Sequence, residues 1–274
     1  MARIRLDKRM VDLALAPSRT QAAELVDRGV VLVNGSLADK AARQVNLGDQ
    51  IVVQDEGHRY VSRGAHKLIK ALDTFGISVH GRCALDAGSS TGGFTEVLLE
   101  RGAKGVVCVD VGTHQLHERI RDDARVIVRE ETNVRDVDRD LVVTWLEGRG
   151  VLDLVVGDLS FTSLEPLMSG LLELAGPHGD LIVLAKPQFE VGKAIASKGR
   201  GVLRSRQDRL AGLLRATDSV TAQNAGIMGV VASPIRGTSG NAEFLIWAKP
   251  FETQTGDVAA MVNAALDEIE VDDA

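Results

Sequence analysis

Four ionisable residues stand at positions that suit proton transfer: Lys67, Asp158, Lys186 and Glu243. Lys67 lies in SRGAHKL, ahead of the first apolar strand-like run in the larger part of the chain. Asp158 ends such a run in VVGDLSF, Lys186 ends another in VLAKPQFE, and Glu243 opens the last in GNAEFL. Desolvation penalises an isolated charge at the end of an apolar strand, so each needs a partner. A single residue of this kind is also explained by a core-edge position with its charge in water, but strand ends are where a doubly wound sheet gathers its active site.

A glycine-rich loop follows the first of these strands, in the stretch ALDAGSSTGGF over residues 84–94. Gly88, Gly92 and Gly93 lack the G-x-G-x-x-G spacing of a dinucleotide-binding loop, which weakens an oxidoreductase hypothesis. Glycines let the backbone approach a ligand closely, and Asp110 at the end of the next strand can accept hydrogen bonds from a ribose diol. An adenosyl ligand without phosphates, S-adenosyl-L-methionine, fits these requirements. The competing interpretation is a tight turn that needs a positive φ.

From residue 61 onward, strand-like runs alternate with helical patterns. Strands are predicted at residues 83–87, 105–110, 125–129, 152–159, 179–187, 226–235 and 241–250. This alternation predicts an α/β fold with a seven-stranded, mostly parallel, Rossmann-like sheet whose ligand sites lie beyond the carboxyl ends of the strands. The predicted organisation is a small α+β domain at 1–57, a linker at 58–62 and the α/β domain at 63–274.

The first 57 residues predict a module of two helices and a short sheet. Residues 6–16 and 18–29 have helical apolar spacing, with Pro17 as the break and Ser18 as the N-cap. Residues 30–38 alternate as a strand with an Asn-Gly hairpin signal, and residues 48–54 supply a closing strand. The pattern R-L-D, S-R-x-x-A, G-x-V-x-V-N-G and G-D-x-I resembles the S4-like RNA-binding domain. That resemblance implies contacts with structured RNA from basic side chains, at Arg3, Arg5, Arg19 and Lys40, with Arg43 as a further candidate.

The formal net charge of −6 conceals two basic segments. Seven acids and no Lys or Arg follow residue 251, and without this tail the formal charge is about +1. The first twenty residues carry five bases against two acids, and residues 186–215 carry eight bases against two. Such patches attract polyanions, although ordinary solvated helix faces would give the same composition.

Composition and termini favour a cytoplasmic protein. No apolar run approaches the roughly 18 residues that a membrane-spanning helix needs, and the N-terminus lacks the apolar stretch of a secretory signal. Cys83 and Cys108 lie inside apolar runs, which indicates buried thiols in a reducing compartment. A membrane-active toxin is a poor alternative, because the last helix-like stretch, VAAMVNAALDEI, is short and its flanks are acidic.

The four ionisable residues, in this order and context, resemble the Lys-Asp-Lys-Glu tetrad of FtsJ-like ribose 2′-O-methyltransferases. With the N-terminal module included, SRGAHKL, DAGSSTGGF, GDLSF, KPQFE and SPIRGTSGNAEFL resemble the TlyA, or hemolysin A, family over nearly the whole chain. The resemblance implies S-adenosyl-L-methionine-dependent 2′-O-methylation of cytidine ribose in 16S ribosomal RNA, 23S ribosomal RNA or both. In mycobacterial relatives this modification accompanies sensitivity to capreomycin.

The same resemblance assigns roles to individual residues. Lys186 is the expected base, and this role requires a neutral amine. Burial and the neighbouring cation Lys67 favour the neutral form, whereas the carboxylates of Asp158 and Glu243 oppose it, so the sequence leaves the balance open. Lys67 would steady the developing alkoxide, while Asp158 and Glu243 would orient the two lysines and prevent an uncompensated buried charge. The implied cofactor contacts are Ala87, Gly88, Thr91, Gly93, Phe94, Asp110 and Asn133. Candidates for the RNA backbone outside the first module are Arg63, Arg135, Lys193, Lys198, Arg200, Arg204 and Arg206, and no metal is expected.

Some alternatives stay open at this point. A non-catalytic RNA-binding assembly factor could retain the same fold, although the intact tetrad and glycine loop favour an enzyme. S4-like modules also occur on pseudouridine synthases, whose chemistry does not suit the strand–helix alternation and adenosyl loop. Residues 58–61 are His-Arg-Tyr-Val, where mycobacterial relatives have an R-A-W-V type of linker. Whether this linker couples RNA binding to cofactor affinity is therefore open. The target nucleotide and the oligomeric state are also open.

Overall fold

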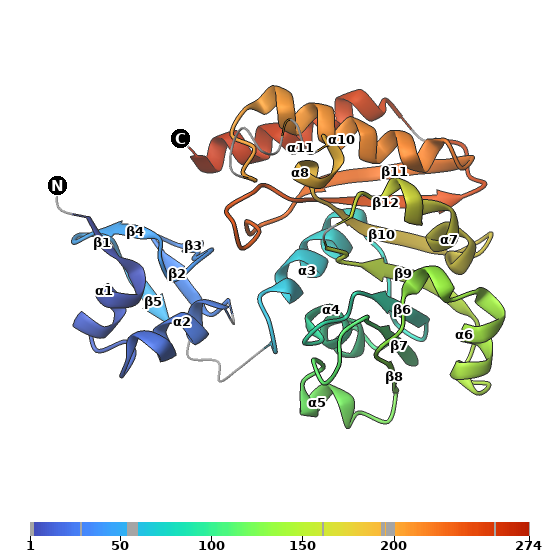
Figure 1. The fold of residues 1–274 in the computed structure, drawn as a ribbon, viewed down its shortest axis with the longest axis horizontal. Helices are drawn as coiled ribbons and strands as arrows, with labels where there is room; N and C mark the ends of the chain where they lie inside the picture. Colours follow the sequence, from blue (N-terminus) through green and yellow to red (C-terminus); the bar gives the residue numbers. More distant parts are fainter. Residues whose placement is uncertain are drawn as a thin grey trace.

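The computed structural model describes residues 3–27, 29–53, 60–160, 162–192, 195, 201–254 and 256–273, with side chains as far as residue 269. A small N-terminal module, within residues 3–53, lies beside a larger α/β domain that begins at residue 60 (Figure 1). Five residues singled out from the sequence lie outside the described residues: His58 and Arg59 of the linker, and the RNA-binding candidates Lys193, Lys198 and Arg200.

The N-terminal module contains two helices and two small sheets. Its elements are β1 (Arg3–Arg5), α1 (Leu6–Asp12), α2 (Arg19–Asp27), β2 (Val31–Val33), β3 (Ser36–Leu37), β4 (Gln44–Asn46) and β5 (Ile51–Val53). One sheet has the order β3-β2-β5 and the other pairs β1 with β4, with every pairing antiparallel. Leu6, Met10, Ala22 and Val26 from the helices close a separate core against the strands.

Local sequence signals explain much of this module. The Ser18 hydroxyl accepts a hydrogen bond from the Gln21 backbone N–H at 3.2 Å, so the predicted N-cap of α2 is confirmed. Asn34 and Gly35 both have positive φ, at 52° and 81°, as a two-residue hairpin turn between β2 and β3 requires. The first helix is shorter than predicted: it ends at Asp12, and Ala14 has a φ of 56°. The β1–β4 pair was missed, because each strand has three residues and its partner lies about forty residues away.

The larger domain alternates strands with helices, as predicted. Its strands are β6 (Cys83–Ala87), β7 (Gly105–Val109), β8 (Val126–Arg129), β9 (Leu152–Gly157), β10 (Asp180–Ala185), β11 (Ala225–Ala232) and β12 (Phe244–Pro250). Its helices are α3 (Gly64–Phe75), α4 (Gly93–Glu100), α5 (Glu118–Arg121), the 3-10 turn η1 (Val134–Asp136), α6 (Arg139–Leu146), α7 (Glu165–Ala175), α8 (Pro187–Glu190), α10 (Arg206–Thr221) and α11 (Val258–Asp273). All seven predicted strands are confirmed, with boundaries that differ by a few residues.

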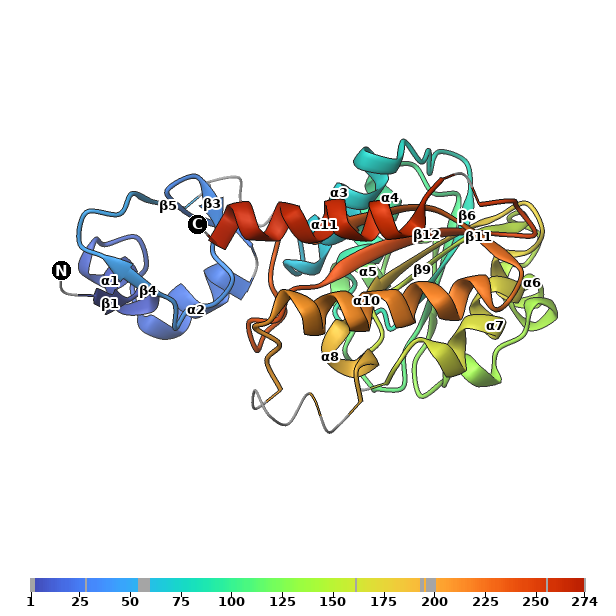
Figure 2. The same ribbon diagram turned by 90° about the horizontal axis from the view of Figure 1, so that it is seen from above.

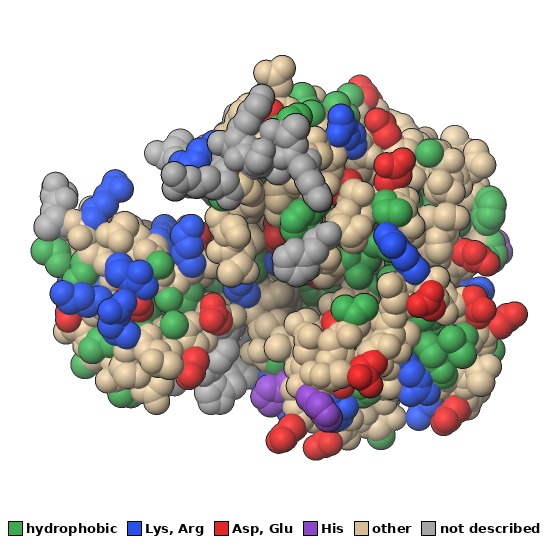
Figure 3. All heavy atoms as spheres, viewed as in Figure 1, with side chains coloured by type: hydrophobic (Ala, Val, Ile, Leu, Met, Phe, Trp, Pro, Cys, Tyr) green, Lys and Arg blue, Asp and Glu red, His purple; other side chains and the backbone are tan. Residues whose placement is uncertain are grey.

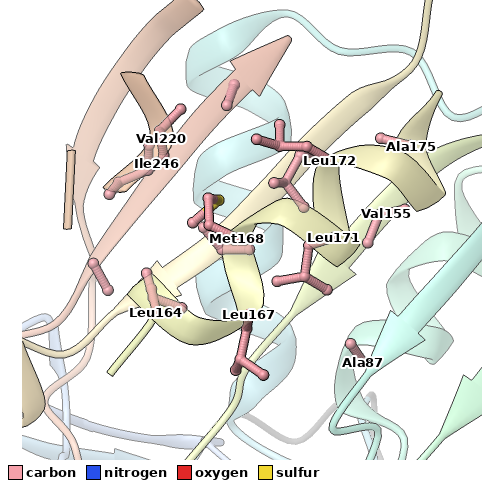
Figure 4. Close-up of a cluster of buried hydrophobic side chains, with 14 of the residues drawn as sticks. Ala87, Val155, Leu164, Leu167, Met168, Leu171, Leu172, Ala175, Val220 and Ile246 are labelled. Carbon is pink, nitrogen blue, oxygen red and sulfur yellow. The ribbon is translucent and has the colours of Figure 1, made fainter. Parts of the chain in front are cut away.

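The sheet has the order β11-β12-β10-β9-β6-β7-β8, and β12 alone runs antiparallel to its neighbours. Helices cover both faces (Figure 2). One core cluster takes side chains from α6, α7, α10 and α11, and the other takes them from α3 and α4. Figure 4 shows the first cluster, where Leu164, Met168 and Leu171 pack against Val155 and Ile246 of the sheet. This layered arrangement confirms the predicted Rossmann-like α/β class.

The sheet topology brings the ends of several strands to a single edge of the sheet. The carboxyl ends of the parallel strands β6, β9 and β10 lie there. Since β12 is antiparallel to β10, with Phe244 opposite Ala185, its amino end lies at the same edge. Residues that end β9 or β10 and residues that precede β12 are therefore neighbours in space.

Candidate active site

The four ionisable residues meet at this edge. Asp158 directly follows β9, Lys186 follows β10 as the N-cap of α8, and Glu243 directly precedes β12. Lys67 reaches them from the first turn of α3. The fold thus collects four side chains from four elements that are distant in the sequence.

These side chains form one chain of ion pairs. Lys67 Nζ lies 2.9 Å from Asp158 Oδ2 and 2.7 Å from Glu243 Oε2. The other carboxylate oxygen of Asp158, Oδ1, lies 2.6 Å from Lys186 Nζ. Lys67, Lys186 and Glu243 are 7%, 7% and 4% exposed, so these largely buried charges compensate one another.

The protonation of two members follows from their surroundings. Burial on its own would lower the pKa of Lys67, but the carboxylates of Asp158 and Glu243 outweigh it and raise that pKa above its ordinary value. Burial would raise the pKa of Asp158, but the charges of Lys67 and Lys186 outweigh it and lower that pKa. Lys67 is therefore a fixed cation and Asp158 a fixed anion at neutral pH.

The glycine loop forms a backbone wall opposite the ion pairs. Gly88 has a φ of +79°, and a Cβ added there would lie 2.9 Å from the carbonyl oxygen of Asp158. Gly92, with a φ of +98°, is the N-cap of α4, and Phe94 in the first turn of that helix is 5% exposed. Glycine suits both this conformation and this closeness, which explains why the loop carries glycine at these two positions.

Two acids end the strands that flank the loop. The Asp110 carboxylate accepts hydrogen bonds from the backbone N–H groups of Ser90 at 2.9 Å and Gly112 at 2.8 Å. Asp86 is 1% exposed and accepts a hydrogen bond from the Thr95 hydroxyl at 2.7 Å. Its burial, with smaller contributions from the nearby carboxylates, raises the pKa of Asp86 to about 7.

One pocket of about 430 Å³ joins the loop to the ion pairs. Among its lining residues are all four ionisable residues and four of the predicted cofactor contacts, Gly88, Thr91, Gly93 and Phe94. Ala87, Asp110 and Asn133 do not line it. Ala87 is buried at the end of β6, and the Asn133 side chain accepts a hydrogen bond from the Arg135 N–H at the start of η1. The cofactor contacts of all seven residues stay predictions.

The pocket also contains groups that the sequence patterns did not single out. Ser160, two residues after Asp158, accepts a hydrogen bond from Lys186 Nζ at 2.7 Å. Ser62 and Thr238 also line the pocket. Their signal in the sequence is weak, because isolated Ser and Thr residues beside a functional motif are common in loops.

Arg63 connects the two parts of the molecule. Its backbone N–H donates to the Asp27 carbonyl at 3.0 Å, and its guanidinium donates to the Asp39 carbonyl and to the Thr238 hydroxyl. Arg63 is also the N-cap residue of α3, one turn before Lys67. These contacts place the N-terminal module against the rim of the pocket, and they show a structural role for a residue predicted to bind RNA.

Several predicted RNA-binding residues lie on the surface. The guanidiniums of Arg5 and Arg19 both pair with Asp7, at 2.8 Å and 2.9 Å, and hold the pKa of that buried carboxyl well below its usual range. Arg3 is also exposed, Lys40 is half-buried, and Lys and Arg side chains gather on this module in Figure 3. In the larger domain, Arg135 and Arg204 are exposed, whereas Arg206 pairs with Asp267 of α11 at 2.8 Å.

A second cleft, of about 910 Å³, separates the N-terminal module from the last strands and α11. Four basic side chains line it, Lys40, Arg43, Lys70 and Arg236, together with Asp39 and Glu268. In the described part of the chain, no helix is long and apolar enough to cross a membrane. Nor do three or more His, Cys, Asp or Glu side chains gather there in a group suited to a metal ion.

Comparison with known proteins agrees with this geometry. Residues 60–250 match the model of the FtsJ-like methyltransferase family, and residues 4–51 match the S4 domain. The chain is 45% identical to the 16S/23S rRNA (cytidine-2′-O)-methyltransferase TlyA of Mycobacterium tuberculosis, over 92% of this chain and 91% of that protein. It is 30% identical to the 23S rRNA (cytidine-2′-O)-methyltransferase TlyA of Campylobacter jejuni, over 84% of this chain and 93% of that protein.

A solved structure, that of a protein from Streptococcus thermophilus described as a hemolysin, has the same architecture. It is 34% identical to this chain and superposes with a TM-score of 0.73, covering 100% of this chain and 99% of that one. The family predicted from the tetrad, the glycine loop and the N-terminal pattern is confirmed: the chain is a member of the FtsJ-like methyltransferase family, of the TlyA type with an S4 domain at its N-terminus.

Proposed function

We propose that this protein transfers a methyl group from S-adenosyl-L-methionine to the 2′-hydroxyl of a cytidine ribose in ribosomal RNA. The observation that carries the proposal is the ion-pair chain of Lys67, Asp158, Lys186 and Glu243, which shares one pocket with the glycine loop. The substrate named for the curated relatives supports the choice of ribosomal RNA.

The pocket suits the methyl donor. Its volume of about 430 Å³ falls within the usual range for a small-molecule site. Gly88 packs directly against the backbone of Asp158 and also lines the pocket, so the glycine loop and the ion-pair chain lie on one continuous wall of the site. Each Asp110 oxygen accepts one backbone N–H and keeps a further lone pair, which can accept a ribose hydroxyl. When bound, S-adenosyl-L-methionine supplies an electrophilic methyl group on a sulfonium.

The residues of the tetrad then divide the work. Lys186 accepts the proton of the 2′-hydroxyl while the 2′-oxygen attacks the methyl carbon and displaces the sulfur. Lys67, held as a cation by Asp158 and Glu243, stabilises the negative charge that develops on the 2′-oxygen. Asp158 bridges both lysines and fixes the distance between base and cation.

The N-terminal module supplies the affinity for RNA in this proposal. Asp7 holds Arg5 and Arg19 side by side, and the exposed N–H groups of the two guanidiniums that Asp7 does not engage can donate to phosphate. Lys40 lines the basic cleft that leads from the module to the larger domain. Structured RNA is recognised largely by its shape and backbone, which fits a surface with charged but few aromatic groups. Arg135 and Arg204, exposed on the larger domain, are further candidates for the RNA backbone.

The test is transfer of a tritiated methyl group to purified ribosomal subunits that lack the modification. Wild type, Lys186→Ala and Lys104→Ala are compared, and product nucleotides are mapped by reverse-transcription stops at low nucleotide concentration. Lys104 is a matched control, because it is an exposed lysine that precedes β7, at the amino end of the parallel strands and far from the site.

We expect label on the 2′-oxygen of a cytidine with wild type and Lys104→Ala, and none with Lys186→Ala. Binding of S-adenosyl-L-methionine, measured by calorimetry, should be retained in all three proteins. If wild type binds the cofactor yet labels neither subunit, the proposal fails, and another RNA substrate or a non-catalytic assembly role takes its place.

A further inference from the structure

The Lys186 amine has two polar partners among the described residues, and both come from the segment that follows β9. Asp158 Oδ1 lies 2.6 Å from Nζ, and Ser160 Oγ accepts a hydrogen bond from it at 2.7 Å. Lys186 is buried, whereas Ser160 is exposed where the pocket opens. Ser160 therefore links the buried base to the exposed part of the pocket lining.

The hydrogen bond between Lys186 and Ser160 restricts the direction of the lone pair on a neutral Lys186 amine. A neutral lysine amine has two N–H bonds and one lone pair in a tetrahedral arrangement. With one N–H given to Asp158 and the other to Ser160, the lone pair must occupy the one remaining direction about Nζ. Without Ser160 the amine can rotate about its terminal bond, and the lone pair has no fixed direction.

Lys67 provides an internal comparison. It is flanked by two carboxylates, which hold it in the charged form. Lys186 is flanked by one carboxylate and one hydroxyl, and the hydroxyl accepts a hydrogen bond without adding negative charge. A second carboxylate at that place would favour the ammonium form, which has no lone pair with which to accept a proton.

We propose that Ser160 is a positioning residue that aims the lone pair of Lys186 at the 2′-hydroxyl and that its neutrality keeps Lys186 able to accept the proton. This inference rests on the proposed methyl transfer. In that step the proton moves from the 2′-oxygen to Lys186 Nζ, the oxygen forms its bond to the methyl carbon, and the bonding pair that held the methyl group leaves with the sulfur.

The test compares Ser160→Ala, Ser160→Thr and Ser160→Asp with wild type in the full-length protein. The rate of a single turnover is measured from pH 6 to 10, and calorimetry gives the dissociation constant for S-adenosyl-L-methionine. Ser169→Ala is the matched control, because Ser169 is an exposed serine on α7 that does not line this pocket. Urea denaturation checks that every variant folds.

We expect Ser160→Ala to slow the single turnover about tenfold, as loss of one directing hydrogen bond would, with the cofactor dissociation constant unchanged. Ser160→Thr keeps the hydroxyl and should restore most of the rate. Ser160→Asp should move the rising limb of the pH–rate profile to higher pH. The same displacement should appear in the NMR titration of the ¹³Cε signal of Lys186, identified by its absence in Lys186→Arg, which needs no turnover.

The outcomes separate the two proposals. Absence of methyl transfer by wild type would refute the function and not bear on the lysine titration. Active wild type together with a fully active Ser160→Ala, a Ser160→Thr as slow as Ser160→Ala, or a Ser160→Asp whose titration matches wild type would each overturn the role of Ser160.

Discussion

Replacing Gly88 by alanine tests whether the glycine loop and the ion-pair chain are one unit. Gly88 has a φ of +79°, a region that costs an L-residue about 1–2 kcal/mol. In addition, the new Cβ would lie 2.9 Å from the Asp158 carbonyl oxygen. Ordinary carbon–oxygen contacts begin near about 3.3 Å, so the two atoms must separate by roughly 0.4 Å.

The separation is costly because neither side is free to move. The Asp158 backbone N–H donates to the Ala87 carbonyl at 3.1 Å, and the Asp158 carboxylate bridges both lysines. Overpacking of this kind typically costs about 1–3 kcal/mol. We therefore expect Gly88→Ala to lose about 2–5 kcal/mol of unfolding free energy in total.

Gly76→Ala separates the cost of a positive φ from the cost of the close contact between the new Cβ and the Asp158 carbonyl. Gly76 caps α3 with a φ of +67°, and nothing lies within 4 Å of its added Cβ, so this variant should lose about 1–2 kcal/mol. Urea denaturation measures both variants. Gly88→Ala should also bind S-adenosyl-L-methionine more weakly by calorimetry and turn over on the order of tenfold more slowly, because a displaced Asp158 misplaces both lysines. Equal losses of stability in the two variants, with cofactor binding unaffected by Gly88→Ala, would refute this reasoning.

Three further predictions concern buried and exposed charges. Lys67→Met should cost about 3–5 kcal/mol of unfolding free energy, because it leaves the buried Glu243 carboxylate without its cation. Glu243→Leu should cost less, because Lys67 keeps its ion pair with Asp158, and the double variant should cost clearly less than the sum of the two in urea denaturation. Because burial raises the pKa of Asp86 to about 7, the folded chain keeps a proton that the unfolded chain releases near pH 4; this stability is complete below about pH 4 and is lost as the pH rises to 7. Asp86→Asn should flatten that decline in unfolding free energies measured between pH 5 and 8, and an unchanged slope would contradict the assignment. Arg19→Ala should weaken binding to a ribosomal RNA fragment and reduce the salt dependence of the binding constant by about one phosphate contact, whereas a loss that does not vary with salt would argue against backbone contact.

The sequence alone determined the sheet of the larger domain. Its strands are apolar on both faces, and runs such as CALDA and LDLVV stand out because burial against helices on both sides demands it. The hairpin at Asn34 and Gly35 and the N-cap at Ser18 were also predictable, since each depends on contacts within a few residues. The short β1–β4 pair was not predictable, because each three-residue strand forms only by pairing with a strand about forty residues away in the sequence.

The candidate site divides in the same way. Residue types and strand-end positions made Asp158, Lys186 and Glu243 candidates, and the resemblance to the family tetrad added Lys67 and selected the set from the sequence. That Lys67 stays charged was decided by the tertiary structure, because the carboxylates of Asp158 and Glu243 both surround its amine after burial. The hydroxyl of Ser160 on Lys186 likewise follows from the place where β9 and β10 end side by side. Local sequence patterns indicate which chemistry a residue type can perform. The ion-pair partners and hydrogen-bond directions of that residue are set only when the antiparallel β12 and the parallel strands bring separate segments to one edge of the sheet.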